Sequence, residues 1–240
     1  MRTLVFCTTF WDDKPELAEA KKPELLDWLL RVDKRFNSPS VFLATGCQDK
    51  PELNPLRSWG GKLWDRRNDI PVISSGEPKT KPYDIFHWSY FLCAFEAALW
   101  HAKSQSFDLL VELESNCWIN PSLNLPKLFG EFLARPELIL SPAWCDQPDF
   151  HFLVMKPAAV PAFLHHRLRG NLVNYDQPKP MLAEIEIGRI FKDRWWKPWA
   201  EPYSIRQGYN VSGWTMVPDE EAKHWPVVGM PSPGIQKLFV

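Results

Sequence analysis

The residues best suited to catalysis or metal binding lie in a short acidic segment, Glu112-Leu-Glu-Ser-Asn116, which directly follows an apolar run. Side chains alternate along a strand, so Glu112 and Glu114 are expected to point the same way, with Asn116 just past the strand end. Oxygen ligands at such a place suit Mg²⁺ or Mn²⁺, because hard ions share oxygen ligands with phosphates. The alternative is a strand end whose acids cap a turn or pair with Lys and Arg.

The elements that must position this segment alternate between strands and helices. Short β-branched and aromatic runs predict strands, and apolar residues at helical spacing predict helices. The expected strands are Thr3–Phe10, Val41–Thr45, Pro71–Ser74, Asp108–Leu113, Glu137–Ser141 and Phe152–Met155. The expected helices run from Pro15 to about Arg31, and over Tyr83–Lys103, Leu125–Ala134, Ala158–Leu168 and Met181–Lys192. This order predicts an α/β fold with an open, mixed, mainly parallel sheet flanked by helices.

In open parallel sheets, ligands bind beyond the carboxyl ends of the strands. That rule brings the loop after Phe10, the loop after Thr45 and the turn at 112–116 to one edge of the sheet. The strand before Glu112 carries almost no polar residue, as expected for a central strand covered on both faces. We therefore expect the acidic segment to lie at the ligand-binding edge.

Composition limits the classes of partner. The chain has 240 residues, which suits one large domain, and 28 basic against 29 acidic residues. A net charge near zero implies no general attraction to nucleic acid or to anionic membrane. The apolar runs are too short for a transmembrane segment, and five cysteines without a CxxC pair predict reduced thiols in a cytoplasmic protein.

The segment from Asp108 to Ile119, DLLVELESNCWI, resembles the strand and DxD turn of the GT-A nucleotide-sugar glycosyltransferases. In that alignment Glu114 replaces the first Asp and Asn116 the second. The resemblance implies that Glu114 contacts the nucleotide ribose or a metal and that Asn116 binds the metal. Because an amide is a weaker ligand than a carboxylate, we expect the Mn²⁺ or Mg²⁺ ion to be weakly held or absent. Glu112 is a candidate for the missing charge.

The same resemblance covers about residues 1–200 in the order of elements. It implies one GT-A-like domain, with a nucleotide-sugar-binding half over about 1–120 and an acceptor-side half over about 121–240. The end of the first strand, at Thr8, Thr9 and Phe10, is then expected to contact the nucleotide base. Ordinary strand termination is the alternative for these three residues.

Two acids in the last predicted helix match the general base of inverting members only loosely. Glu184 and Glu186 project about 200° apart on a helix, so one of them at most faces the site, and we favour Glu186. Alternatively, both lie on a solvated face beside Arg189 or Lys192. His224 resembles the late His that completes the family's metal shell, although a lone His is more often a surface or packing residue.

The sequence therefore predicts a glycosyltransferase that moves a sugar from a nucleotide-diphospho-sugar donor to an acceptor hydroxyl. The first alternative is a noncatalytic nucleotide- or carbohydrate-binding protein of the same fold, which Asn116 favours. A second alternative is an interaction module built on the 13 tryptophans.

Overall fold

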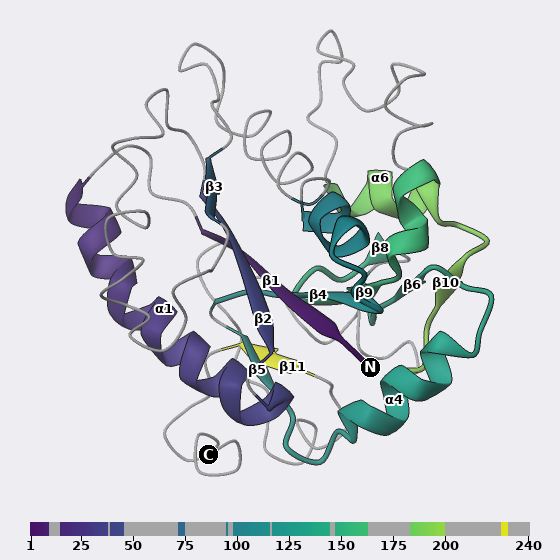
Figure 1. Ribbon diagram of the computed structural model, residues 1–240, viewed down its shortest axis with the longest axis horizontal. Coiled ribbons are helices and arrows are strands. Elements are labelled where there is room, and N and C mark those ends of the chain that lie inside the picture. The colour runs from purple at the N-terminus through teal and green to yellow at the C-terminus, as the bar shows by residue number, and fades with distance from the viewer. Residues whose placement is uncertain are drawn as a thin grey trace, which may run out of the picture.

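A computed structural model describes residues 1–9, 15–37, 39–45, 72–74, 95, 98–115, 117–144, 147–162, 183–199 and 227–229 (Figure 1). Its strands are β1 (Thr3–Thr9), β2 (Ser40–Thr45), β3 (Val72–Ser74), β4 (Leu109–Leu113), β5 (Cys117–Ile119), β6 (Ile139–Leu140), β7 (Ala143–Trp144), β8 (Gln147–Pro148), β9 (Phe152–Met155), β10 (Trp195–Trp196) and β11 (Val227–Gly229). Its helices are α1 (Pro15–Phe36), α4 (Leu125–Leu133) and α6 (Ala183–Ile190), with a further helical stretch at 98–104 and a 3₁₀ turn at Pro157–Ala159.

Seven of these strands form one sheet in the order β10-β6-β9-β4-β1-β2-β3. The pairs β4–β1, β1–β2, β2–β3 and β10–β6 are parallel, whereas β9 is antiparallel to both of its neighbours. Strands β5 and β11, and strands β7 and β8, form two small antiparallel ribbons. The predicted α/β fold with a mixed, mainly parallel sheet is confirmed.

The reversed direction of β9 decides which residues meet. The carboxyl ends of β1, β2 and β4 lie at one edge of the sheet because these strands are parallel. Since β9 is antiparallel, it begins where β4 ends, with Leu113 paired to Phe152. The residue after β4, Glu114, therefore lies at the same edge as the residue before β9, His151.

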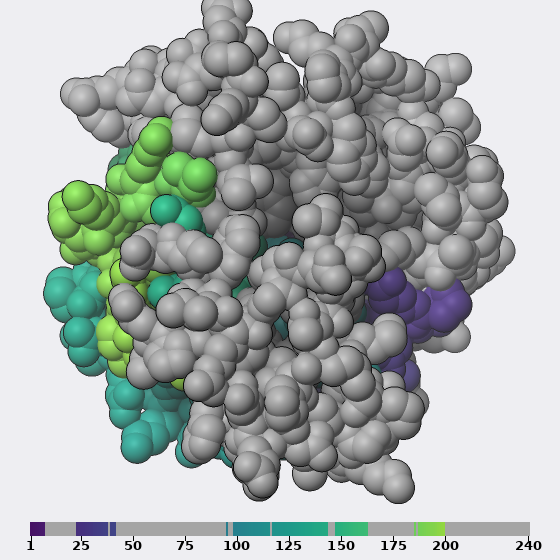
Figure 2. Space-filling view, turned by 180° about the vertical axis from the view of Figure 1, so that it is seen from behind, coloured from purple at the N-terminus to yellow at the C-terminus, as the bar shows by residue number. Residues whose placement is uncertain are grey.

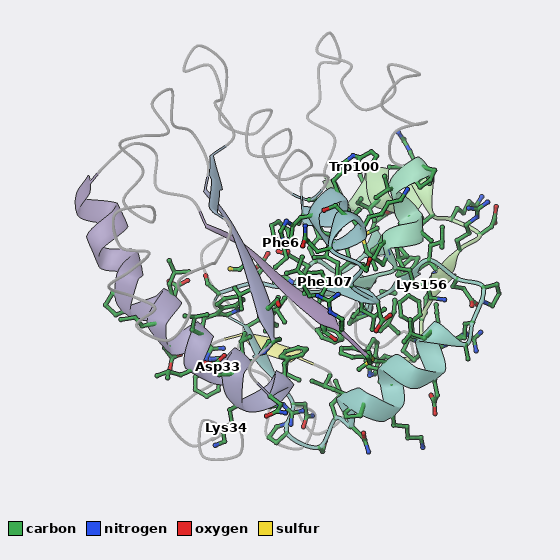
Figure 3. All side chains as sticks on the ribbon, in the orientation of Figure 1. Phe6, Asp33, Lys34, Trp100, Phe107 and Lys156 are labelled. Atoms are coloured by element: carbon green, nitrogen blue, oxygen red, sulfur yellow. The ribbon has the colours of Figure 1, made fainter. Side chains whose placement is uncertain are left out.

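Each face of the sheet is covered by its own set of helices. One face packs on α1 and α4 through Trp28, Val32 and Phe129. The other face packs on the helix at 98–104 and on α6, and there Phe6 meets Phe95 edge to face with ring centroids 5.6 Å apart. Figure 3 shows Phe6 in this interior. Alternate residues of β4 serve the two faces, which explains why the whole strand is buried.

The observed elements differ from the predicted ones mainly at their ends. Helix α1 continues to Phe36, beyond the predicted end near Arg31, and stops at Asn37, whose φ of 56° is left-handed. The predicted helix at 158–168 begins as a 3₁₀ turn, and its part beyond 162 lies outside the described residues. Strands β5, β7, β8, β10 and β11 have two or three residues each, too few to show a period.

In the space-filling view from behind, the green surface of residues 183–199 adjoins the teal surface of the central segments, and α1 emerges on the opposite flank (Figure 2). Within the part of the chain that the structure describes, no helix combines the length and apolar character needed to cross a membrane.

Candidate functional site

The site begins with a buried acid at the end of the central strand. Glu112 is opposite Phe6 of β1 on one side and Leu153 of β9 on the other. Its side chain is completely buried, and neither carboxylate oxygen has a hydrogen-bond partner among the described residues. Burial first, and then the charge of Glu114, hold the pKa of the Glu112 carboxyl well above its usual range. Among the described residues, the fold thus retains a buried carboxyl without a hydrogen-bond partner.

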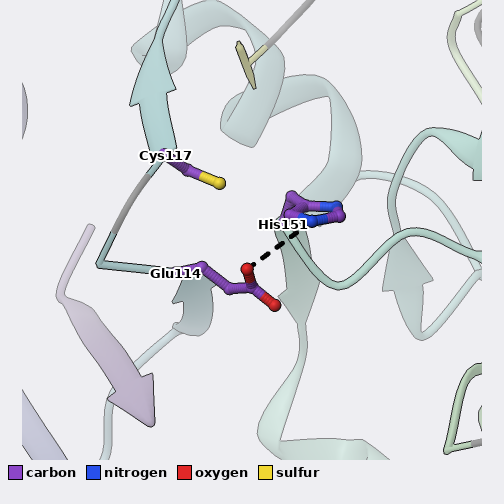
Figure 4. Close-up of side chains that lie close together, drawn as sticks. All are labelled: Glu114, Cys117 and His151. Atoms are coloured by element: carbon purple, nitrogen blue, oxygen red, sulfur yellow. Dashed lines mark ion pairs between the residues drawn. The ribbon is translucent and has the colours of Figure 1, made fainter. Parts of the chain in front are cut away.

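Glu114 lies just beyond β4 and is partly open to solvent. A third of its side chain is exposed, and its Oε2 lies 3.5 Å from Nε2 of His151. Figure 4 shows the two side chains pointing toward each other, with Cys117 beside them. Glu114 is therefore the acid of this turn that a ligand reaches from solvent.

A second carboxylate orients His151 from its other side. The backbone N–H of His151 donates to Oδ1 of Asp149 at 3.0 Å, and ring atom Nδ1 contacts the same oxygen. Asp149 is buried, and its Oδ2 has no hydrogen-bond partner among the described residues. When Nδ1 carries its proton toward Asp149, the other ring nitrogen presents its lone pair to Glu114.

Cys117 completes the group across a tight turn. Its backbone N–H donates to the carbonyl of Glu114 at 3.0 Å, which closes the chain between them. Burial raises the pKa of the Cys117 thiol well above its usual range, and the charges of Glu114 and Asp149 raise it further. One ligand atom from each of Glu114, Cys117 and His151 lies within 4.8 Å of the others.

Helix α1 holds this turn from the side of the core. The indole N–H of Trp28 donates to the carbonyl of Leu113 at 3.1 Å. Arg31 donates to the carbonyl of Ser115 at 2.9 Å and to that of Cys117. Because these bonds fix backbone carbonyls on both sides of the turn, the positions of Glu114 and Cys117 are set by two side chains of α1.

Helix α6 packs against β8 in the same region, with Gly188 at the contact. A Cβ at Gly188 would lie 2.6 Å from Oε1 of Gln147 and 3.2 Å from Cδ of Pro148, so a larger residue there would require the side chain of Gln147 to shift. Strand β8 ends one residue before Asp149. The backbone of Glu184 and Glu186 is in α6. Their assignment as general base stays a prediction.

The remaining predicted site residues have different outcomes. Thr8 and Thr9 end β1 at the edge where β4 also ends, which agrees with the predicted placement of that strand end. Phe10, Asn116 and His224 lie outside the described residues. The nucleotide-binding and metal-binding roles of all these residues stay predictions.

Sequence reasoning missed three residues that the structure brings to the acidic turn: Cys117, Asp149 and His151. The spacing Glu114-x-x-Cys117 was a signal, because two ligands three positions apart across a turn are common in metal sites. The pair Asp149-x-His151 gave a weaker signal, and only the antiparallel register of β9 brings it to Glu114.

No protein-family model matches this sequence, and no curated protein matches it either. Solved structures do match. The glycosyltransferase GlyE of Streptococcus pneumoniae TIGR4 aligns with a TM-score of 0.53 at 11% identity, over 97% of this chain and 55% of that one. This chain thus spans about half the length of GlyE.

Two other glycosyltransferases are similar over most of their own length. One, involved in glycosylation of the major capsid of PBCV-1, has a TM-score of 0.51 at 13% identity, over 99% of this chain and 97% of that one. The galactosyltransferase LgtC, solved with donor and acceptor sugar analogs, has a TM-score of 0.52 at 11% identity, over 96% of this chain and 87% of that one. This chain has the GT-A fold. At such identities the likeness establishes the fold, and activity must be argued from the site.

Proposed function

We propose that this protein transfers a sugar from a nucleotide-diphospho-sugar donor to an acceptor hydroxyl. The observation that carries the proposal is the acidic turn at the carboxyl end of β4, where Glu112 is buried without a described partner and Glu114 is open to solvent. Retaining a buried acid costs stability, and such costs are concentrated at functional sites. The GT-A fold supports the reaction class.

The roles of the two acids follow from their exposure. Glu114 reaches solvent, so its carboxylate is placed to accept hydrogen bonds from hydroxyl groups of the donor. Glu112 lies underneath, where its raised pKa keeps the carboxyl protonated over a wider pH range. We assign the donor to the half of the domain over about 1–120, with Thr8, Thr9 and Phe10 near the nucleotide base.

The acceptor is assigned to the half over about 121–240. Helix α6 packs on β8, which directly precedes Asp149, and this proximity supports a role for an acid of the helix in the reaction. We propose that Glu186, or else Glu184, removes the proton from the acceptor hydroxyl as its oxygen bonds to the anomeric carbon of the sugar. The bond from that carbon to the diphosphate breaks, and the nucleoside diphosphate leaves. Effective bases of this kind are worth about 10²–10⁴-fold in rate.

The Mn²⁺ or Mg²⁺ ion implied by the family resemblance is not supported by the donor atoms around Glu114. The nearest described candidates, Cys117 and His151, offer sulfur and nitrogen, whereas these hard ions prefer oxygen. Roles for Asn116 and His224 as metal ligands stay predictions. The proposed transfer is therefore written without a metal-dependent step.

Titration with UDP, GDP and dTDP, each with and without Mn²⁺, tests the proposal by calorimetry. We expect one of the three to bind, and the matching nucleotide-sugars to release that nucleoside diphosphate when incubated with the protein. Binding without any turnover of the sugar nucleotides would indicate the noncatalytic alternative. Absence of binding to every nucleotide would contradict both.

A further inference from the structure

Three side chains with different donor atoms converge at the carboxyl end of β4. Glu114 offers oxygen, Cys117 sulfur and His151 nitrogen, all within 4.8 Å of one another (Figure 4). The ligand atoms of a tetrahedral zinc ion lie about 3.3–3.8 Å apart, given bond lengths of about 2.0–2.3 Å. Oε2 of Glu114 and Nε2 of His151 lie 3.5 Å apart. One edge of the triangle therefore already matches such an ion.

Asp149 gives the ring of His151 a fixed direction toward Glu114. Ring atom Nδ1 contacts Oδ1 of Asp149, and Nε2 lies 3.5 Å from Oε2 of Glu114. Because Cys117 lies beside this pair, an oxygen, a nitrogen and a sulfur donor surround a common point.

We propose that Glu114, Cys117 and His151 bind one Zn²⁺ ion, and that Asp149 orients His151 as its outer-shell carboxylate. A carboxylate on the far nitrogen of a zinc-bound His is a recurrent arrangement, because it fixes the tautomer and the direction of the ring. The site shares Glu114 with the proposed sugar transfer, but the binding of the ion is argued from its own three ligands and does not depend on turnover.

The backbone supplies a preformed frame for these ligands. The N–H of Cys117 donates to the carbonyl of Glu114 at 3.0 Å, so the two ligands stand at the ends of a closed turn. Arg31 of α1 donates to the carbonyls of Ser115 and Cys117 and fixes that turn from below. Ligands held in this way lose little freedom when the metal binds, which favours affinity.

The donor atoms of the site determine which ion it binds, and the exposure of its residues determines from which side the ion enters. Mixed oxygen, nitrogen and sulfur donors fit Zn²⁺ and disfavour Mg²⁺ and Mn²⁺. Cys117 and His151 are buried, whereas a third of Glu114 is exposed, so the ion enters from the side of Glu114. Three protein ligands leave a fourth position for water or for an oxygen of a bound substrate.

Metal binding to the full chain, stripped of metal with a chelator, tests the proposal directly. Zn²⁺ is titrated against a chromophoric indicator, and Mg²⁺ and Mn²⁺ are titrated in parallel. We expect one Zn²⁺ per chain, bound at least 100-fold more tightly than either other ion. Co²⁺ is expected to replace it and to show thiolate charge-transfer absorption with the intense visible bands of tetrahedral cobalt. An octahedral Co²⁺ spectrum without thiolate absorption would overturn the assignment.

Variants assign the ligands, with circular dichroism as the check on folding. Glu114→Gln and His151→Ala are each expected to weaken Zn²⁺ binding more than 100-fold, and Asp149→Asn by about 10–100-fold. The matched control is Cys7→Ala, which removes a buried thiol from the neighbouring strand β1 and should leave Zn²⁺ affinity unchanged. Cys117→Ser should abolish the thiolate absorption of the Co²⁺ form.

The outcomes separate this proposal from the proposed transfer. Zn²⁺ bound equally by the wild type, Glu114→Gln and His151→Ala would place the ion elsewhere and overturn the site. Nucleotide binding without Zn²⁺ binding would also overturn the site while leaving the transferase proposal intact. Zn²⁺ binding that needs these ligands, in a chain that binds no nucleotide, would support the site and contradict the transferase.

Discussion

The two ends of strand β4 use charged residues in opposite ways. At the amino end, Oδ2 of Asp108 accepts the backbone N–H of Arg2 at 2.6 Å. The guanidinium of Arg2 donates to the carbonyls of Gln105 and Ser106 and lies 4.7 Å from the ring centroid of Phe107. At the carboxyl end, Glu112 is buried with both oxygens unpaired among the described residues.

The charged groups at the two ends of β4 differ in their cost to the stability of the fold. Exposed and paired groups at the amino end cost little to keep and contribute little. Buried carboxyls at the carboxyl end carry a desolvation cost that packing elsewhere must offset. A single strand therefore has one end suited to stability and another suited to binding, and each prediction below tests that contrast.

The largest expected effect is the loss of activity in Glu114→Ala. Removing the exposed acid should lower the release of nucleoside diphosphate from the sugar nucleotide by about 10²-fold or more while the fold remains. Asp108→Ala, at the other end of the strand, is the matched control and should retain wild-type activity. Equal activity in both variants would remove the distinction between the two ends.

The next effect is on stability, through the helix that supports the carboxyl end. Trp28→Phe leaves the carbonyl of Leu113 without its indole donor and opens a small cavity, so unfolding free energy should fall by about 2 kcal/mol. Chemical denaturation measures the change. Trp100→Phe, on a tryptophan with 42% of its surface exposed, should change it by less than about 0.5 kcal/mol.

Glu112→Gln should change how stability depends on pH. The pKa of Glu112 is raised in the folded state, so its favourable contribution is complete below the unfolded pKa and is lost as pH rises through the folded pKa. A glutamine carries no charge, so the stability of the variant relative to wild type should increase from acidic to neutral pH, by about 1.4 kcal/mol per unit of pKa difference.

Thermal unfolding at a series of pH values measures this trend. Glu131→Gln, which changes an exposed acid of α4, should show no such trend relative to wild type. A pH-independent difference for Glu112→Gln would mean that this carboxyl is paired in the folded protein.

The smallest effect is expected at the amino end. Arg2→Ala removes exposed hydrogen bonds and the contact with Phe107, which should cost less than about 1 kcal/mol and leave turnover of the sugar nucleotide unchanged. Denaturation and activity assays on the same preparation check both statements. A strong loss of activity would show that the amino end also takes part in function.

Much of the fold could be predicted because its signals are local. The apolar run before Glu112 predicted a central strand, and β9 was predicted with its observed bounds, Phe152–Met155. The end of α1 was missed because Asn37, rather than a glycine, adopts the left-handed conformation there. Strand β10, at Trp195–Trp196, was not predicted, since two residues carry no period.

The site could be predicted only in part, because its residues meet through long-range pairing. Glu112 and Glu114 were identified from their place after a buried strand. His151 was not identified, because nothing in the local sequence places it beside Glu114. That neighbourhood depends on the antiparallel register of β9 on β4, with Leu113 opposite Phe152.

The reversed direction of β9 also has a consequence during synthesis. Parallel strands β1, β2 and β4 all precede β9 in the chain, so the acidic turn emerges from the ribosome before the segment that completes it. At about 5–20 residues per second, the interval lasts a few seconds. During that time Glu112 remains hydrated on the side that β9 later covers, and its burial is complete only after β9 pairs. Closure of the site is therefore a late event in the life of the nascent chain.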